Sequence, residues 1–253
     1  MKNLNNKFSI ITSIYNGDLY LNNYFNQIYN QKLKPFEIII IDDGNNKLLN
    51  KFVQKYKKKN LKIKIIKNKK NLGSAKSLNK GINKAKTKIL FRLDVDDLWN
   101  KNHTQTCMSI INKYPNFGLY SQKIDLNFLQ KNTDDNYHVN RNTLIHSSWV
   151  LNLNILNSFR YTGGKKQCED YMTLTKYLLS GLKIYYFKKI TVLHNNNHSG
   201  HGIKNSYKVE LARKQCSIKL FNFYKNKSSS LISFIFFKFG FFPFLYFLYR
   251  NYI

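Results

Sequence analysis

The stretch FEIIIIDDG, residues 36–44, joins an unbroken apolar run to two acidic residues and a glycine. An apolar run of this kind is typical of a strand that lies inside a parallel sheet and is covered by helices on both faces. Similar runs occur at residues 8–17, FSIITSIYNG, and at residues 88–97, KILFRLDVDD. All three stop at polar residues, so the sequence predicts three buried strands with polar ends.

Segments with helical spacing of apolar residues separate these runs. They are found at residues 19–31, 47–58 and 71–84, and residues 61–66 alternate Lys with Ile or Leu as an outer strand does. Alternating strands and helices predict an α/β fold with a doubly wound mixed sheet whose N-terminal half is mainly parallel. Ligands bind beyond the carboxyl ends of the strands in such sheets, so the polar strand ends form the first candidate site.

The second half of the chain has a less regular pattern. We expect helices at residues 102–114 and 169–179, strands at 118–124 and 183–187, and a polar loop at 125–142. The expected organisation is one domain over residues 1–215, followed by a helical tail over residues 216–253.

The chain is strongly basic, with 42 Lys and Arg against 13 Asp and Glu and a formal net charge of +29. Such an excess points to nucleic acid or an anionic membrane as a partner. Genome composition is a second explanation, because Lys, Asn, Ile, Phe and Tyr all have codons rich in A and T. Hydrophobic residues make up 43% of the chain, which excludes a disordered polyelectrolyte. The three cysteines lack metal-binding spacing and fit a reducing cytoplasm.

Residues 231–249 form an aromatic and aliphatic segment with basic flanks. Lys238 lies near its centre and Pro243 would break or kink a helix there, which disfavours a membrane-spanning helix. Aromatic residues between cationic flanks favour a segment that lies on an anionic leaflet. Packing of this segment on the domain's own core is the alternative.

Three acidic residues, Asp94, Asp96 and Asp97, lie within four positions after an apolar strand. Unpaired carboxylates repel one another, so such a cluster favours a bound cation. Mg²⁺ and Mn²⁺ take carboxylate oxygens and keep coordination positions for phosphate. An exposed acidic turn that pairs with lysines is the alternative.

The order of the motifs is more specific than any one of them. The chain contains, in this order, Tyr15–Asn16, Asp42–Asp43–Gly44, Asn71–Leu72–Gly73, Asp94–Val95–Asp96–Asp97 and Cys168–Glu169–Asp170. This series resembles the family 2 glycosyltransferases of the GT-A fold. The resemblance implies an inverting, metal-dependent enzyme that moves a sugar from a nucleotide-sugar donor to an acceptor hydroxyl, with Mn²⁺ or Mg²⁺ as cofactor.

The resemblance also implies partners and a location. The donor would be a UDP-sugar, and the acceptor a glycan or lipid-linked oligosaccharide of bacterial polysaccharide, lipopolysaccharide or capsule biosynthesis. Residues 5–100 would bind the nucleotide sugar and residues 101–215 the acceptor. The tail would hold the cytoplasmic enzyme at the inner face of the cell membrane.

Donor-binding roles follow from the matched motifs. Tyr15 would lie against the base of the donor, and Asp42 would accept a hydrogen bond from the base edge. Asp43 would lie near the ribose or buttress the turn. The remaining donor-binding residues implied by the resemblance are Thr12, Ser13, Asn16, Asn71, Gly73 and Asp94.

The resemblance assigns the reaction centre to two acidic groups. Asp96 would bind the metal between the donor phosphates, Asp94 would help through the ribose or a metal-bound water, and Asp97 would cap the following turn. Asp170 would take the proton of the acceptor hydroxyl, and Glu169 would orient the acceptor or the base. A plain acidic helix N-terminus is the alternative interpretation of that pair. Further candidates are His146 and Trp149 on the acceptor side, and His194 and His198 near the metal or diphosphate.

One departure from the family pattern concerns the donor. Many relatives carry Ala-Arg-Asn where this chain has Ser77–Leu78–Asn79, so the arginine that contacts the donor is absent. Lys76 and Lys80 are nearby cations, but a lysine cannot reproduce a bidentate arginine contact.

Two other functions are alternatives. A non-catalytic nucleic-acid-binding protein would explain the charge, but the sequence has no zinc finger, RNA-recognition motif or base-reading helix, so we expect no nucleic-acid partner. A nucleotidyltransferase also uses paired acids with a metal, but no Gly-rich phosphate loop follows the first strand.

Overall fold

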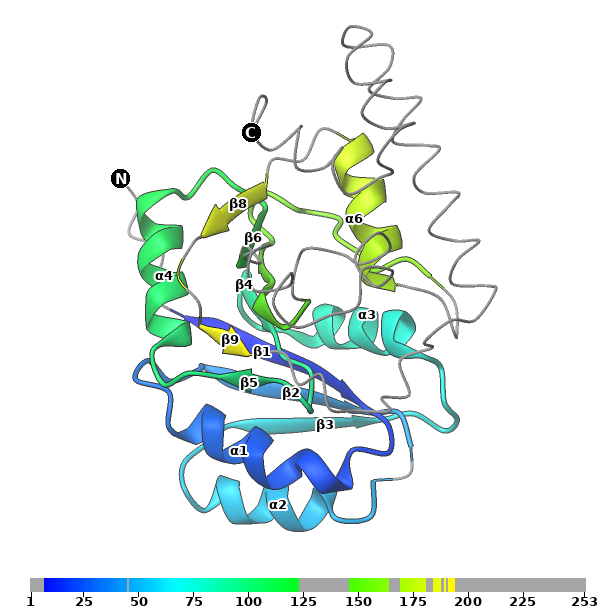
Figure 1. The fold of residues 1–253 in the computed structure, drawn as a ribbon. Coiled ribbons are helices and arrows are strands. Elements are labelled where there is room, and N and C mark those ends of the chain that lie inside the picture. Colours follow the sequence, from blue (N-terminus) through cyan, green and yellow to red (C-terminus); the bar gives the residue numbers. More distant parts are fainter. Residues whose placement is uncertain are drawn as a thin grey trace, which may run out of the picture.

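A seven-stranded sheet forms the centre of the protein (Figure 1). The computed structural model describes residues 7–44, 46–122, 146–163, 169–180, 184–187, 189 and 191–193. The strands lie in the order β3 (Ile63–Lys67), β2 (Glu37–Asp42), β1 (Phe8–Ile14), β4 (Ile89–Arg92), β7 (Val150–Asn152), β6 (Leu119–Gln122) and β8 (Ile184–Phe187).

The first four strands of this order are parallel, as the sequence predicts. β7 enters between β4 and β6 and is antiparallel to both, whereas β6 and β8 are parallel. The prediction of a mixed α/β sheet with a mainly parallel N-terminal half is therefore confirmed. The position of β7 did not follow from the sequence.

Helices cover both faces of the sheet. Figure 1 shows α1 (Leu21–Tyr29) and α2 (Leu49–Lys57) on one side and α3 (Ser74–Lys84) on the other. Residues of α4 (His103–Lys113) join the core of the first side, and residues of α6 (Glu169–Leu179) join that of the second. The smaller elements are the 3₁₀ turns η1 (Asp18–Tyr20) and η3 (His146–Ser148) and a two-stranded sheet of β5 (Leu98–Trp99) and β9 (Val192–Leu193).

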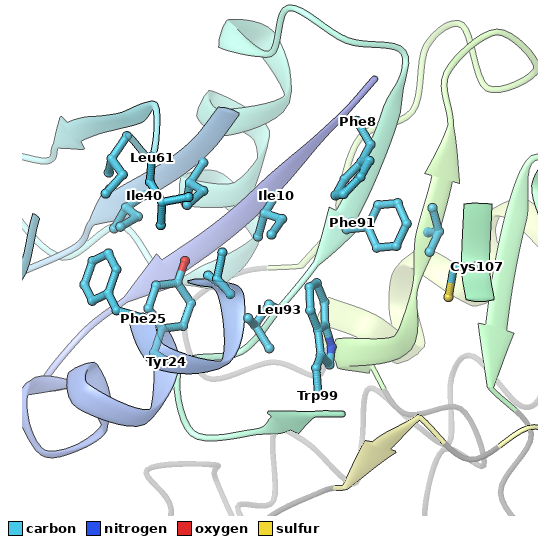
Figure 2. Close-up of a cluster of buried hydrophobic side chains, with 14 of the residues drawn as sticks. Phe8, Ile10, Tyr24, Phe25, Ile40, Leu61, Phe91, Leu93, Trp99 and Cys107 are labelled. Atoms are coloured by element: carbon cyan, nitrogen blue, oxygen red, sulfur yellow. The ribbon is translucent and has the colours of Figure 1, made fainter. Parts of the chain in front are cut away.

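The alternation of side chains along the strands explains the two cores. Ile38 and Ile40 of β2 join the cluster under α1 and α2, and Ile39 and Ile41 join the cluster under α3. Figure 2 shows the first cluster, in which Phe8, Phe25, Phe91 and Trp99 fill the space between the sheet and the helices. Both faces are buried, so the central strands must be apolar throughout, and the chain becomes polar only where the strands end.

The strand register brings the polar ends to one edge of the sheet. Ile14 of β1 lies opposite Asp42 of β2, and Ile11 lies opposite Arg92 of β4. Asp94 therefore follows β4 at the same edge at which Tyr15 follows β1. This register places the polar strand ends, from which the candidate site was predicted, at one edge of the sheet.

Several predictions concern residues outside those that the structure describes: the domain boundary at residue 215, the tail over residues 216–253, and the histidines His194 and His198. Within the described ranges, no helix combines the length and apolar character needed to cross a bilayer.

Candidate active site

Asn46 ties together the loops that follow β1 and β2. Its side-chain nitrogen lies 3.0 Å from the carbonyl oxygen of Ile14 and 2.7 Å from Asp42 Oδ1. Its side-chain oxygen accepts a hydrogen bond of 2.8 Å from the backbone N–H of Gly17. Sequence analysis missed Asn46. Its position could have indicated the role, because an amide two residues after the Asp-Asp-Gly turn can both donate and accept hydrogen bonds.

Tyr15 presents its ring at this edge, with 43% of the residue exposed. Gly44 has φ of +119°, and a Cβ added there would lie 3.7 Å from the Tyr15 ring. The positive φ is what favours glycine here, whereas a Cβ at that distance would only touch the Tyr15 ring. Asn16 beside it is exposed and left-handed, with φ of 54°, and Ser13 is half-buried. The β1 end therefore offers an open aromatic face with polar groups around it.

Thr12 is buried and does not face solvent. Its hydroxyl donates to the carbonyl of Leu93 at 2.8 Å and accepts from the Tyr24 hydroxyl at 2.9 Å. Thr12 therefore links β1 to the end of β4 and to α1, a position that supports the site from beneath.

The two acids after β2 have different surroundings. Asp43 is 2% exposed and accepts hydrogen bonds from the backbone N–H groups of Leu72 and Gly73, at 2.8 and 2.9 Å, and from the Asn68 side chain at 2.8 Å. These are the contacts of a residue that buttresses the loop before α3. Asp42 is half-buried beside it and accepts from the backbone N–H of Gly44 at 3.2 Å.

The same loop contains the predicted Asn71 and Gly73. Asn71 accepts a hydrogen bond of 3.0 Å from the backbone N–H of Gly73, and Gly73 has φ of 83°. Asp43 and Asn71 together fix a left-handed glycine at the start of α3, next to the ends of β1 and β2.

A buried arginine stands behind the acids that follow β4. Arg92 is 1% exposed, its guanidinium forms an ion pair with Asp94, and it donates to the carbonyl of Leu93 at 2.5 Å. Partial burial would raise the pKa of Asp94, but the Arg92 cation, with His146 and Ser147, outweighs this and holds that pKa below its usual value. Asp94 is therefore a firmly ionised carboxylate.

Ser147 connects the two outer acids of this motif. Its hydroxyl lies 3.1 Å from Asp94 Oδ2 and also contacts the Asp97 carboxylate. Asp97 is 2% exposed, whereas Asp96 between them is half-buried. Asp97 thus belongs to the framework of the turn, and Asp96 reaches its surface.

The acids that open α6 lie against the same site. Burial, then the neighbouring Asp170 charge and to a smaller extent Asp94, raise the pKa of Glu169 to about 7. The Glu169 carboxylate also takes a hydrogen bond from Ser74 at the start of α3. A Cβ added at Gly163 would lie 3.3 Å from the Cα of Glu169, and Tyr161, two positions before Gly163, contacts His146 beside Asp94. The acids that open α6 therefore lie near those after β4.

His146 lies between these groups. Its Nδ1 is 3.8 Å from Asp94 Oδ2 and its Nε2 is 3.2 Å from the Tyr161 hydroxyl. Burial and then the Arg92 cation lower the pKa of His146, so its ring is neutral near pH 7. Trp149 is 1% exposed and packs edge-on against this ring at 4.8 Å, and Tyr161 is a further site residue that sequence analysis missed.

A metal centre is not complete within the described residues. The ranges that the structure describes contain no group of three or more His, Cys, Asp or Glu side chains that could hold a metal ion. A cavity of about 740 Å³ lies elsewhere, between α4 and β8, and none of the residues of the candidate active site lines it.

Comparison with known proteins gives the family. The family model described as Glycosyl transferase family 2 matches residues 9–164. An uncharacterized glycosyltransferase of Haemophilus influenzae is 33% identical over 105 residues, which cover 42% of this chain and 32% of that protein. The Escherichia coli protein named UDP-Gal:alpha-D-GlcNAc-diphosphoundecaprenol beta-1,3-galactosyltransferase is 32% identical over 110 residues, covering 42% of this chain and 40% of that protein. The matched part thus spans well under half of these relatives.

Solved structures show the same fold. TarS of S. aureus in complex with UDP-GlcNAc has a TM-score of 0.67 at 19% identity, and the match covers 85% of this chain and 67% of that one. The mannosyltransferase PcManGT from Pyrobaculum calidifontis, in complex with GDP-Man and Mn²⁺, has a TM-score of 0.58 at 16% identity and covers 87% of this chain and 64% of that one. The family match over more than half of the chain, together with this shared architecture, confirms the resemblance seen in the sequence: the chain belongs to glycosyl transferase family 2 and has the GT-A fold.

Proposed function

We propose that this protein transfers a sugar from a nucleotide-sugar donor to an acceptor hydroxyl with inversion at the anomeric carbon. The observation that carries the proposal is the shared site of two acidic groups, Asp94–Asp97 after β4 and Glu169–Asp170 at the start of α6. One group follows β4 at the sheet edge at which Tyr15 follows β1, and the other comes from the second half of the chain. Such a pair suits a reaction with a leaving diphosphate on one side and an attacking hydroxyl on the other.

The donor would occupy the ends of β1 and β2. The exposed ring of Tyr15 would stack on the base, and Asp42, with Ser13 and Asn16, would hydrogen-bond its edge or the ribose. Asn71 and Gly73 would line the same pocket, whereas Thr12 and Asp43 would hold its walls. UDP is the proposed nucleotide, a choice supported by the UDP-GlcNAc in the structure of TarS.

Asp96, helped by Asp94, would hold a divalent cation between the donor phosphates. The family pattern assigns the direct ligand to Asp96, and Arg92 and Ser147, which contact the oxygens of Asp94, would hold that second carboxylate in place. One or two carboxylates with phosphate oxygens and water fit Mg²⁺ or Mn²⁺, so the residues present suit the ion. When bound, the cation would stabilise the charge that develops on the departing diphosphate.

Asp170 would act as the base. As the acceptor oxygen forms a bond to the anomeric carbon and the bond to the diphosphate breaks, the hydroxyl proton would pass to Asp170. Glu169, whose pKa is raised to about 7, would orient the acceptor or Asp170 by a hydrogen bond. His146 would contact the acceptor, and the buried Trp149 would fix the position of the His146 ring.

The acceptor proposed is a lipid-linked glycan in bacterial polysaccharide, lipopolysaccharide or capsule biosynthesis. The name of the Escherichia coli relative, which includes a GlcNAc-diphosphoundecaprenol, supports this proposal. A cytoplasmic enzyme at the inner face of the membrane would meet both the soluble donor and such an acceptor.

The proposal is tested by a panel of UDP-, GDP- and dTDP-sugars with Mn²⁺ or Mg²⁺. We expect a thermal upshift and slow donor hydrolysis with one nucleotide class, both lost when EDTA removes the metal. No upshift and no hydrolysis with any donor would overturn the proposed activity.

A further inference from the structure

Residues 47–70 form a continuous basic surface, which we name the α2–β3 face. The segment contains eleven lysines and no acidic residue. All eleven lysine residues are exposed. The segment folds as α2, a turn and β3, and Figure 1 shows these elements together at one end of the sheet. Because β3 is the outermost strand, this face lies at the periphery of the molecule.

The lysines of α2 are arranged with helical periodicity. Leu49, Val53 and Tyr56 point into the core, and the opposite side of the segment carries Lys47, Lys51, Lys55 and Lys59 at intervals of four residues. Like charges four residues apart repel and weaken a helix. Within α2 this applies to Lys51 and Lys55, and Lys47 and Lys59 extend the same line of positive charge beyond the two ends of the helix.

Ion pairs within the protein do not neutralise this charge. None of the eleven lysines forms a salt bridge to another described residue. Some lie over aromatic rings instead: the ammonium of Lys59 is 4.6 Å from the ring of Tyr29, and that of Lys62 is 5.0 Å from the ring of Phe36. Such contacts hold the ammonium groups at the surface and leave their charge in place.

We infer that the α2–β3 face binds the anionic surface of a lipid bilayer. Lysine is a compact point charge that suits an array of lipid phosphates, and clustered lysines near an anionic leaflet add their attractions. Nucleic acid fits less well, because single strands need exposed aromatic platforms and duplexes need an element that enters a groove. The two aromatic residues of the segment, Phe52 and Tyr56, are half-buried and buried.

Protection of an edge strand accounts for only part of the pattern. Lysines on β3, such as Lys64 and Lys67, would block pairing with another sheet. That purpose does not require the stripe on α2. The inference extends the membrane location in the proposed function but uses none of the residues proposed for catalysis, so each can fail separately.

The test measures binding of the full chain to vesicles by sedimentation. Vesicles of neutral phosphatidylcholine are compared with vesicles that contain about 30% phosphatidylglycerol, over a salt range of about 50–500 mM. The variant Lys51→Gln/Lys55→Gln/Lys58→Gln removes three charges from the α2–β3 face. The matched control Lys84→Gln/Lys86→Gln/Lys88→Gln removes three exposed charges from the end of α3 and the segment between α3 and β4.

We expect wild type to bind the anionic vesicles and to be released by salt. The α2 variant should bind them on the order of a hundredfold more weakly, and the control within about threefold of wild type. Thermal melting checks that both variants fold, and donor hydrolysis should be unchanged in both. Equal losses of vesicle binding in the two variants, or vesicle binding that salt does not weaken, would overturn the inference. Binding to duplex DNA is measured in parallel, and an α2 variant that loses DNA binding but keeps vesicle binding would overturn it as well.

Discussion

The ends of β2 and β4 carry similar acidic sequences but hold their acids by different means. After β2, the buried Asp43 accepts hydrogen bonds from neutral groups, two backbone N–H groups and an amide. After β4, a buried cation, Arg92, pairs with Asp94. In each motif one acid belongs to the framework, Asp43 or Asp97, and its neighbour, Asp42 or Asp96, reaches the site. Some of the carboxylates in such an acidic motif therefore serve the framework of the turn, and only the others are available to the site.

The largest effect should follow from removing the cation at the β4 end. Arg92→Met leaves the Asp94 charge without its partner, and we expect a loss of about 3–5 kcal/mol in the free energy of unfolding. Adding Asp94→Asn removes the unpaired charge and should restore part of that loss. Urea unfolding measures both; an Arg92→Met variant as stable as wild type would show that the ion pair with Asp94 does not stabilise the β4 end.

A smaller loss should follow at the β2 end, where the donors are neutral. Asp43→Ala leaves the N–H groups of Leu72 and Gly73 without their acceptor, and we expect a loss of about 2–3 kcal/mol. The adjacent Asp42→Ala is the matched control and should cost about 1 kcal/mol, because Asp42 is half-buried. Equal losses from the two substitutions would contradict the assignment of Asp43 to the framework.

The smallest effect is a pH dependence of folding stability, which we expect from Glu169 at the start of α6, near the end of β4. The pKa of Glu169 is raised to about 7 from 4.5. Between these values the folded protein keeps a proton that the unfolded chain loses, so this group's contribution to stability declines as pH rises through that window. Glu169→Gln should remove a decline of about 1–3 kcal/mol, since one pKa unit corresponds to about 1.4 kcal/mol.

Thermal melting of wild type and Glu169→Gln at about pH 5 and pH 8 measures this difference. The variant should lose less stability than wild type between the two values. Parallel curves would mean that the Glu169 proton is not linked to folding.

Much of the fold could be predicted because the N-terminal half repeats one simple pattern. Strands such as residues 37–42 are buried on both faces, which requires apolar residues throughout and polar residues only at the end. β7 was not predicted, because three residues carry no periodicity and their antiparallel pairing with β4 depends on contacts distant in sequence.

The acidic residues of the candidate site could be predicted from the sequence, whereas the residues that hold them in place could not. Asp94, Asp96, Glu169 and Asp170 stand out by type and spacing, and the structure brings Asp94 and Glu169 together. Asn46 makes four contacts, and two of them reach Ile14 and Gly17 at the end of β1, which no local pattern encodes.

Arg92 offered a signal that was not used. A charged residue inside an apolar strand needs a buried partner, and Asp94 lies two positions away. Thr12 and Trp149 matched family positions in the sequence, yet both are buried. Their burial could not be predicted, because a motif does not show on which side of a strand end a side chain lies.

The most direct test of the account separates donor binding from turnover in two variants of the shared acidic site. Calorimetric titration with the active nucleotide sugar and Mn²⁺, followed by a turnover assay, is applied to Asp96→Asn and Asp170→Asn. We predict that Asp96→Asn loses metal-dependent donor binding, whereas Asp170→Asn binds the donor as wild type does and turns over about 10²–10⁴-fold more slowly. Wild-type turnover in Asp170→Asn, or unchanged donor affinity in Asp96→Asn, would contradict the division of roles between the two acidic groups.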